Sequence, residues 1–534
     1  MERGSNRKLV PEDRDRFAWN IPDRFNIAER CCDSWAEIDP DRVAMTDINA
    51  AGTAHDVTFA MLRDRSDRLA TALRGLGVER GDRVALLLSQ GPEALIGHFA
   101  TMKIGAIALP LFTLFGPDAL RYRLGDSGAK VAITDGENLD KLISVSNDLP
   151  GLRHVICTEV QDKVTQLDEL IERAAPLPER IETSPDDPAM MIYTSGTTGS
   201  PKGVLHAHRF LLGHLPCFEV NHDALRDGDV GWTPADWAWI GGLMDLAMPC
   251  LYYGIRLVSH RMRKFEAEGA WSLVAYQDVT RLFLPPAALR MMRRVPVPEG
   301  VRVRSISSGG EALGADLLDW GRETLGAAIN ELYGQTECNL VAASDAAHGV
   351  QRPGSVGRAV PGHRVAVLDD EAQPVWNTLG EIAVRRPDPG MFLRYWNQPE
   401  KTEAKFTGDW MRTGDLGRMD GDGYLTFVSR DDDVINSSGY RVGPTEIEDC
   451  LLRHEAVASA AVVGLPDPQR GQAITAFVVR SEGAEDEDLA DRLITHVRDA
   501  LGPYVAPRVV HFRDSLPMTT TGKIMRRALR EEKG

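Results

Sequence analysis

Short apolar runs alternate with amphipathic stretches through most of this chain, and this alternation limits the folds that it can adopt. Residues 82–90, 129–135 and 153–159 are short apolar segments typical of buried strands. Residues 92–111 indicate a helix, a glycine turn and another strand. Because strands that alternate with helices form βαβ units, the pattern predicts an α/β fold with mixed, mostly parallel sheets flanked by helices.

The pattern changes after Gly354, where short strands separated by turns predict a small β-rich subdomain. Three successive aspartates, beginning at Asp431, then separate a strand from a new helical segment. We therefore expect a large N-terminal domain of residues 1–431 and a small, mobile α+β C-terminal domain of residues 432–534.

The net charge of the chain restricts its partners. The sequence carries 61 Lys and Arg against 78 Asp and Glu, a formal charge of −17, which argues against nucleic acid or an anionic membrane as the main partner. We find no apolar signal segment at the N-terminus and no stretch long enough for membrane insertion. The seven cysteines form no C-x-x-C pair, so we expect reduced thiols in a cytoplasmic protein.

A loop rich in glycine and hydroxyl residues follows one apolar strand. Residues 194–203, TSGTTGSPKG, are mainly Gly, Ser and Thr, with one lysine, Lys202. Pro201 and Gly203 break the G-x-x-x-x-G-K-[ST] pattern of the common phosphate loop. Glycine nevertheless allows close backbone approach to a ligand, and a loop after a parallel strand lies at the ligand-binding edge of a sheet. The loop is therefore predicted to bind phosphate, with a plain connector as the alternative.

Residues 193–203 also resemble the phosphate-loop signature of the adenylate-forming superfamily, which includes acyl-CoA synthetases, firefly-type luciferases and peptide-synthetase adenylation domains. Other motifs of this superfamily occur in the expected order at residues 102–111, 331–338, 412–417, 429–448 and 517–527. Because the motifs cover nearly the whole chain, it is identified as a member of this superfamily, resembling short- to medium-chain acyl-CoA synthetases.

The resemblance implies an ATP-dependent acid–CoA ligase. A carboxylate attacks the α-phosphate of ATP to give acyl-AMP and pyrophosphate, and the thiol of coenzyme A then displaces AMP. Because the first step brings two anions together, the site needs cationic groups and N–H donors, with Mg²⁺ on the phosphates. The implied small-molecule partners are a carboxylic acid, ATP, Mg²⁺ and coenzyme A.

The matched motifs assign roles to individual residues. Lys523 resembles the lysine that stabilises the transition state between carboxylate and phosphate, Glu337 the carboxylate associated with Mg²⁺, and Thr336 a phosphate contact. A solvated tail lysine and a helix-start glutamate are the alternative interpretations of Lys523 and Glu337. The nucleotide- and coenzyme-binding set implied by the resemblance is Thr194, Ser195, Gly196, Thr197, Thr198, Lys202, Gly310, Glu311, Ala312, Glu331, Tyr333, Gln335, Asp415, Arg430, Arg441 and Gly439.

Two features of this set concern the ribose and the motion of the C-terminal domain. Asp415 resembles the aspartate that accepts both ribose hydroxyls, with Arg430 beside it. Because Lys523 must leave the site before the thiol enters, the family rotates its C-terminal domain, and Asp432 matches the hinge position. Lysines of this motif are acetylated in similar enzymes, which makes acetylation of Lys523 an open question.

The residues expected around the acyl group are Trp232, Thr233, Trp237, Gly309 and Gly334. Acetyl-CoA synthetases place a tryptophan at the position of Gly334 and a valine at that of Gly309, so the resemblance predicts a pocket larger than acetate requires. The tryptophans either trim this pocket or pack the core. A short- to medium-chain, branched or methylthio aliphatic acid is the first choice, and an aryl acid is the second.

Two other functions remain open at this point. A stand-alone adenylation enzyme would load a carrier protein, and a binding or regulatory protein would keep the fold without catalysis. The joint presence of Lys523, Glu337, Asp415 and Arg430 argues against the latter. Asp236 does not match the phenylalanine–aspartate pattern of amino-acid-activating domains, and we expect it to be structural. The oligomeric state is open, with a homodimer among the options.

Overall fold

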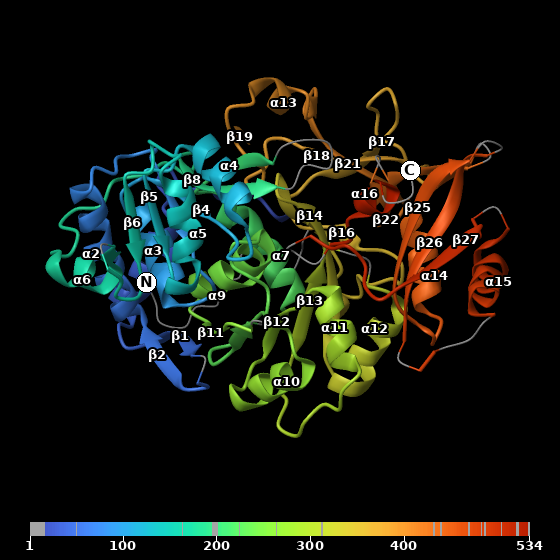
Figure 1. The fold of residues 1–534 in the computed structure, drawn as a ribbon, viewed down its shortest axis with the longest axis horizontal. Helices are drawn as coiled ribbons and strands as arrows, with labels where there is room; N and C mark the ends of the chain where they lie inside the picture. The colour runs from blue at the N-terminus through green and yellow to red at the C-terminus, as the bar shows by residue number, and fades with distance from the viewer. Residues whose placement is uncertain are drawn as a thin grey trace.

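A large N-terminal body and a smaller C-terminal lobe make up the molecule in a computed structural model (Figure 1). The structure describes residues 16–49, 51–162, 164–194, 201–223, 225–262, 264–310, 313–430, 433–437, 440–467, 470–481, 483–484, 488–503, 505–519 and 523–531. The α/β architecture expected from the alternating pattern is confirmed.

One sheet of the body follows the βαβ prediction closely. Its strand order is β19-β9-β8-β4-β3-β5-β6-β7. The strands from β8 to β7 pair in parallel, whereas β9 and β19 add antiparallel pairs at one edge. The strands are β3 (Arg83–Leu87), β4 (Ile107–Pro110), β5 (Val131–Thr134), β6 (His154–Cys157), β7 (Thr165–Gln166), β8 (Pro188–Thr194), β9 (Lys202–Ala207) and β19 (Arg394–Tyr395).

The larger sheet is parallel in one half and antiparallel in the other. Its order is β17-β18-β21-β22-β16-β15-β14-β13-β12-β10-β11-β1-β2, with β20 on β21. The strands are β1 (Val43–Ile48), β2 (Ala54–Thr58), β10 (Val230–Trp232), β11 (Arg256–His260), β12 (Arg281–Phe283), β13 (Ser305–Gly309), β14 (Ala328–Gln335), β15 (Cys338–Ala343), β16 (Gly357–Ala359), β17 (Val365–Leu368), β18 (Gly380–Arg385), β20 (Phe406–Thr407), β21 (Trp410–Met419) and β22 (Tyr424–Arg430). The expected β-rich subdomain is thus the antiparallel end of this sheet, because β15 and β16 join it to β14.

The C-terminal lobe has its own sheet and its own core, as predicted for an α+β unit. Its strands are β23 (Ile435–Ser437), β24 (Tyr440–Val442), β25 (Val457–Asp467), β26 (Gly471–Arg480) and β27 (Val509–Arg513). Strand β27 pairs with β26 in parallel, and the other strands pair antiparallel. Helices α14 (Pro444–Leu452), α15 (Leu489–Leu501) and α16 (Arg526–Glu531) complete the lobe.

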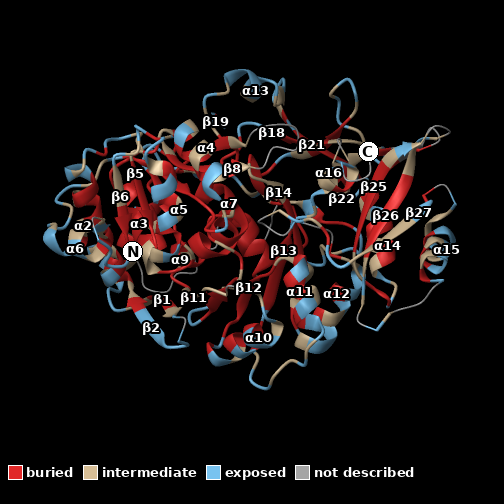
Figure 2. Cartoon of the chain, in the orientation of Figure 1, coloured by how far each residue is buried: buried red, intermediate tan, exposed pale blue. Residues whose placement is uncertain are grey.

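Two helices of the body are buried between its layers, as Figure 2 shows in red. Every residue of α7 (Phe210–Asn221) is buried, and so is every residue of α3 (Pro92–Lys103) after its first turn. The remaining helices of the body are η2 (Glu29–Asp33), α1 (Ser34–Ile38), α2 (Phe59–Gly75), α4 (Pro117–Ser127), α5 (Gly136–Ser146), α6 (Leu167–Arg173), α8 (Ile240–Gly242), η3 (Leu243–Ala247), α9 (Met248–Tyr253), α10 (Ala267–Tyr276), α11 (Pro286–Arg293), α12 (Ala315–Trp320), η4 (Gly321–Leu325), η5 (Ala346–His348) and α13 (Pro399–Glu403).

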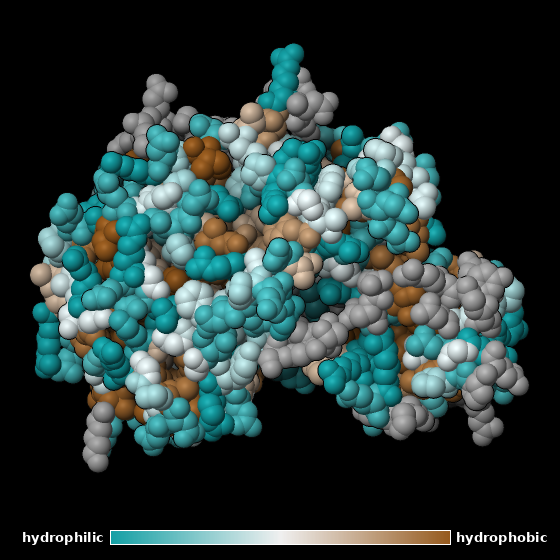
Figure 3. Space-filling model, turned by 90° about the horizontal axis from the view of Figure 1, so that it is seen from above, coloured by the Kyte–Doolittle hydropathy of each residue, from teal (hydrophilic) through white to brown (hydrophobic). Residues whose placement is uncertain are grey.

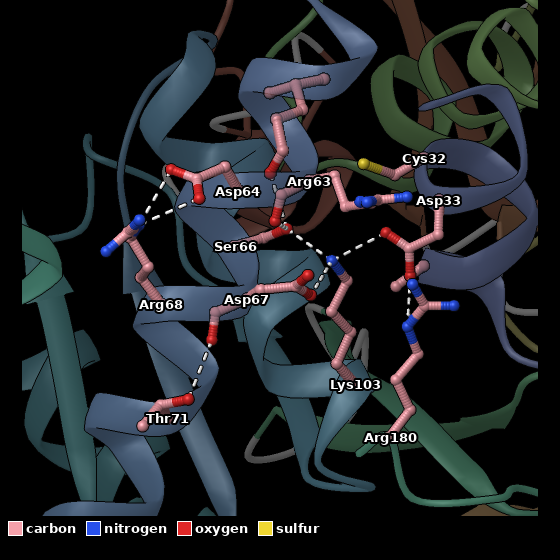
Figure 4. A network of polar contacts seen from close by, with 12 residues as sticks. Cys32, Asp33, Arg63, Asp64, Ser66, Asp67, Arg68, Thr71, Lys103 and Arg180 are labelled. Carbon is pink, nitrogen blue, oxygen red and sulfur yellow. Dashed lines mark hydrogen bonds and ion pairs between the residues drawn. The ribbon is translucent and has the colours of Figure 1, made fainter. Parts of the chain in front are cut away.

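A buried charge cluster fixes the end of α3 (Figure 4). The ammonium of Lys103 lies 2.8 Å from Asp33 Oδ1 and 2.7 Å from Asp67 Oδ1, and it donates to Ser66 Oγ at 2.8 Å. Arg180 Nε lies 3.1 Å from the other oxygen of Asp33. Because the two cations are matched by two carboxylates, the cluster is neutral and tolerates its burial.

The surface seen from above is mostly hydrophilic, with apolar residues dispersed over it (Figure 3). Within the described part of the chain, no helix combines the length and the apolar character needed to cross a membrane. Every one of the seven cysteines falls in the described residues, and each is buried and free of disulfides, as expected for reduced thiols.

Candidate active site

The loop that the sequence predicts to bind phosphate lies between two paired strands. Strand β8 ends at Thr194 and β9 begins at Lys202, which are register partners; Ser195, Gly196, Thr197 and Thr198 lie outside the described residues. The ammonium of Lys202 lies 4.8 Å from the centre of the Tyr395 ring. Burial lowers the pKa of Lys202, and the negative charge of Glu337 opposes this downward shift.

Glu337 lies in a tight turn between two strands. Strand β14 ends at Gln335 and β15 begins at Cys338, so the alternative that Glu337 starts a helix is wrong. The Glu337 side chain is buried, and Tyr395 donates its hydroxyl hydrogen to Glu337 Oε1 at 2.5 Å. Tyr395, on β19, was missed by the sequence interpretation because no motif includes it.

A second cluster surrounds Asp415. Tyr333 donates its hydroxyl hydrogen to Asp415 Oδ2 at 2.6 Å, and Arg430 Nη1 lies 3.2 Å from Asp415 Oδ1. Gln335 donates to the backbone oxygen of Thr413 at 3.0 Å. Burial raises the pKa of Asp415, whereas the charge of Arg430 lowers it. Residues that the motifs singled out separately are therefore adjacent in space.

Lys523 of the C-terminal lobe reaches the body. It belongs to a hairpin in which Thr519 N donates to Lys523 O at 2.7 Å and Lys523 N donates to Thr519 Oγ1 at 3.1 Å. Its Cε lies 3.6 Å from the point that a Cβ on Gly310 would occupy. The charge of Lys523 also lowers the pKa of Asp415. Lys523 therefore lies beside the body cluster; Glu311 and Ala312, next to Gly310, lie outside the described residues.

Gly309 and Gly334 do not open the space expected of them. A Cβ on Gly309 would lie 2.2 Å from Leu332 Cδ1, and one on Gly334 would lie 2.4 Å from Leu340 N and 2.9 Å from Asn339 Cα. The expectation that these glycines enlarge the acyl pocket is wrong, because Leu332 and the backbone of β15 already fill the adjoining volume.

The tryptophans divide between the core and the site. Trp232 and Trp237 are fully buried in apolar clusters, and Thr233 is buried with its carbonyl held by Gln90. Trp239 is half-buried, and its indole Cζ2 lies 3.8 Å from the same point above Gly310 that Lys523 approaches. Its ring centroid lies 5.6 Å from that of Phe283. Trp239 is thus the tryptophan beside Lys523, whereas the residues expected around the acyl group include Trp237.

Asp236 keeps the structural role expected of it. Its carboxylate accepts the Ala238 N–H at 2.7 Å, and burial raises its pKa to about 6. The hydrogen bond caps the turn that leads into Trp239, so Asp236 shapes this loop.

Glu331 lies at the seam between body and lobe. Burial, together with the negative charge of Asp449 on α14, raises its pKa to about 8. Burial likewise raises the pKa of Asp449 to about 7, and the charges of Arg290 and Arg453 oppose this shift. A cavity of ≈ 560 Å³ opens at the same seam between α11 and α12 on one side and the end of α14 on the other.

The other residues that the sequence predicts for the site are described by the structure only in part or not at all. Asp432 and Gly439 lie outside the described residues, and for Arg441 only the backbone, in β24, is described. Thr336 occupies the turn before Glu337.

The side chains that could donate to a metal ion show whether the site is suited to Mg²⁺. No group of three or more His, Cys, Asp or Glu side chains in the described ranges is arranged to hold a metal ion. Glu337 offers one buried carboxylate near Lys202. This donor set fits Mg²⁺, which proteins commonly bind with one or two carboxylates plus substrate phosphates.

Known proteins resemble this chain over most of its length. Residues 32–396 match the family model described as AMP-binding enzyme, and residues 446–523 match the AMP-binding enzyme C-terminal domain. An acetyl-coenzyme A synthetase of Bacillus subtilis is 33% identical over 89% of this chain and 84% of its own length. The mitochondrial acyl-coenzyme A synthetase ACSM4 of Rattus norvegicus is 33% identical over 96% of this chain and 91% of its own.

A solved structure shows the same likeness in three dimensions. The anthranilate CoA ligase AuaEII, in complex with anthranoyl-AMP, superposes with a TM-score of 0.89 at 28% identity, covering 96% of this chain and 98% of that one.

Proposed function

This chain belongs to the family of AMP-binding enzymes, and we propose from that premise how its own residues activate a carboxylic acid and which acids it takes. It is an AMP-forming acid–CoA ligase that uses ATP, Mg²⁺ and coenzyme A. The observation that carries the residue assignment is the approach of Lys523 to Gly310, next to the cluster of Tyr333, Asp415 and Arg430.

In the first half-reaction, the acid carboxylate attacks the α-phosphate and pyrophosphate leaves. Asp415 is proposed to accept the ribose hydroxyls, since a carboxylate offers two acceptor oxygens for two donors. Lys523 brings one positive charge to the point where two anions meet, which stabilises the transition state more than the separated reactants. Lys202 adds a second cation on the phosphate side.

Glu337 is proposed to hold Mg²⁺ together with the nucleotide phosphates. When bound, Mg²⁺ neutralises phosphate charge that would otherwise repel the incoming carboxylate. The hydroxyl of Tyr395 orients the Glu337 carboxylate through the hydrogen bond to Oε1. The buried setting of Glu337 strengthens its attraction for cations.

In the second half-reaction, the thiol of coenzyme A attacks the acyl carbon and AMP leaves. We propose that the C-terminal domain of residues 432–534 turns away from residues 1–431 about Asp432, which removes Lys523 and admits the thiol. Gly439 is proposed to face the thiol channel, and Arg441 is proposed to face the phosphates during acid activation. The family matches to residues 32–396 and 446–523 leave a junction that contains this boundary, which supports the division.

The acid is proposed to be a short- to medium-chain, branched or methylthio aliphatic acid larger than acetate, on the resemblance of the motifs to short- to medium-chain acyl-CoA synthetases; the similarity to an acyl-coenzyme A synthetase agrees with an acyl substrate. An aryl acid is the second candidate, because the Trp239 and Phe283 rings lie at the site and a structurally similar ligase binds anthranoyl-AMP. The buried free cysteines support a cytoplasmic location. A homodimer and acetylation of Lys523 remain predictions from the sequence.

A pyrophosphate-release screen tests the proposal. Linear C2–C10, branched, methylthio and aryl acids are supplied with ATP, Mg²⁺ and coenzyme A, and the products are identified by mass. We expect the highest kcat/KM for an aliphatic acid of four or more carbons. A maximum at acetate would contradict the proposed acid class, and a maximum at benzoate or anthranilate would favour the second candidate.

A further inference from the structure

A buried amide lies two residues after Glu337. Asn339, at the start of β15, is 4% exposed. Its Nδ2 donates to Asp245 Oδ1 on η3 at 2.5 Å and lies 3.0 Å from His214 Nε2 on α7. Segments far apart in the chain therefore meet at one side-chain amide.

The partners of His214 fix the direction of these hydrogen bonds. His214 Nδ1 lies 2.7 Å from the carbonyl oxygen of Phe210. A carbonyl only accepts, so Nδ1 carries the proton, and in the neutral ring Nε2 is then an acceptor. Burial lowers the pKa of His214 to about 4, in agreement with a neutral ring. Both hydrogens of the Asn339 amide are thus used, one on a carboxylate and one on an imidazole.

The backbone around Asn339 is compressed and strained. The following residue, Leu340, has a φ of 58°, a left-handed conformation that strains a residue with a side chain. Gly334 on the facing strand has no room for a Cβ, because Leu340 N and Asn339 Cα lie against it. A strained, closely packed strand needs an anchor, and the hydrogen bonds of Asn339 to η3 and α7 supply one.

We propose that Asn339 is a positioning residue for acid activation, which holds the turn of Thr336 and Glu337 through its hydrogen bonds to Asp245 and His214. The turn is tied at one end by the Tyr395 hydroxyl on Glu337 and by the bond from Phe392 N to Glu337 O at 2.8 Å. Asn339 ties the strand that leaves the turn, two residues after Glu337. The proposal rests on the role proposed above for Glu337 as the protein ligand of the metal–nucleotide complex.

The test compares four variants by the affinity for Mn²⁺–ATP, measured calorimetrically without acid, and by pyrophosphate release. Asn339→Leu removes both hydrogen bonds of the Asn339 side chain. Asn138→Leu is the control, because Asn138, on α5, is also a buried asparagine, and its amide donates to Asp135 at 2.8 Å. Asp245→Asn keeps an acceptor for Asn339. Glu337→Gln tests the metal role on its own.

We expect Asn339→Leu to weaken Mn²⁺–ATP binding roughly 10-fold or more, as for other residues that orient a metal ligand. Asn138→Leu and Asp245→Asn are expected to bind Mn²⁺–ATP with an affinity within about 2-fold of that of the unaltered enzyme, because neither change leaves Asn339 without its hydrogen-bond acceptors. If Glu337→Gln weakens binding but Asn339→Leu does not, the inference is wrong and the proposed function stands. If Glu337→Gln has no effect, the metal role of Glu337 fails first.

A second variant keeps the proposal testable if Asn339→Leu does not fold. Asp245→Leu leaves Asn339 in place but removes the acceptor of one of its two hydrogen bonds. We expect this variant to bind Mn²⁺–ATP roughly 10-fold more weakly than the unaltered enzyme, as for other residues that orient a metal ligand. An affinity equal to that of the unaltered enzyme would overturn the proposal.

Discussion

Replacing Glu331 by glutamine should change how pH controls closure of the C-terminal lobe onto the body. Glu331 is buried at the seam, and its pKa is raised to about 8 in the closed arrangement, mainly by burial and then by Asp449. When the lobe turns away, Asp449 leaves with α14, and we expect the pKa of Glu331 to fall toward its ordinary value of 4.5. Closure at neutral pH therefore takes up a proton.

The sign and size of the effect follow from this linkage. A carboxyl whose pKa is raised in the closed form favours closure fully below its ordinary pKa, and the contribution is lost as pH rises toward the raised value. Each pH unit between the two values changes the closure equilibrium by up to about 10-fold, so closure at pH 7 is weaker than at low pH by at most about 3 kcal/mol, the value for a complete return of the pKa to 4.5. The linked titration of Asp449, raised to about 7, acts in the same direction.

Interdomain energy transfer between dyes on the body and the lobe would measure the closed fraction from pH 5 to 9, with ATP and a non-reacting acid analogue present. Glutamine mimics the protonated carboxyl, so Glu331→Gln is expected to remain closed at pH 8 and to form the thioester more slowly than the unaltered enzyme. Glu323→Gln, on the surface of η4, is the control. A closed fraction of the unaltered enzyme that does not depend on pH, or a Glu331→Gln profile with the same slope, would refute the reasoning.

Three further predictions concern the site itself. Lys523→Ala should slow pyrophosphate exchange at least ~100-fold, because one preorganised charge is lost, but the variant should still convert supplied acyl-AMP to the thioester. Equal losses in the two steps would count against the proposed role of Lys523. Gly309→Val should lower the thermal midpoint through a clash worth about 1–3 kcal/mol, and adding Leu332→Ala should restore only part of it, because a Cβ at position 309 would still lie 2.7 Å from the Leu332 backbone oxygen; a stable single variant would show that the space is open after all. Trp239→Ala should raise kcat/KM for longer acids relative to butyrate, and an unchanged chain-length profile would remove Trp239 from the acyl pocket.

Local patterns predicted the strands well, because strands depend on short stretches of sequence, whereas the roles of the motif residues stay predictions. Strands β3, β5 and β6 lie within the apolar segments that indicated them. The wrong expectations depended on contacts across the fold. The volume beside Gly309 is decided by Leu332 on the neighbouring strand, and no spacing rule reveals which side chain faces a glycine.

The contacts between the body and the C-terminal lobe could not be predicted from sequence patterns either. Glu331 was grouped with the nucleotide ligands because of its motif, whereas its charge neighbour, Asp449, belongs to another domain. Trp239 differs from Trp237 only in the direction of its side chain, which the loop after β10 determines. Such features appear only when the complete fold is known.

The position of β1 has a consequence for synthesis on the ribosome. Strand β1 pairs with β2 on one side and with β11, near residue 256, on the other. At about 5–20 residues per second, roughly 200 further residues take ~10–40 s to emerge. During that interval one edge of a nascent β-hairpin has no partner, and an unpaired edge invites pairing with other chains. We expect ribosome-bound chains that end before β11 to be the forms that most require chaperone binding.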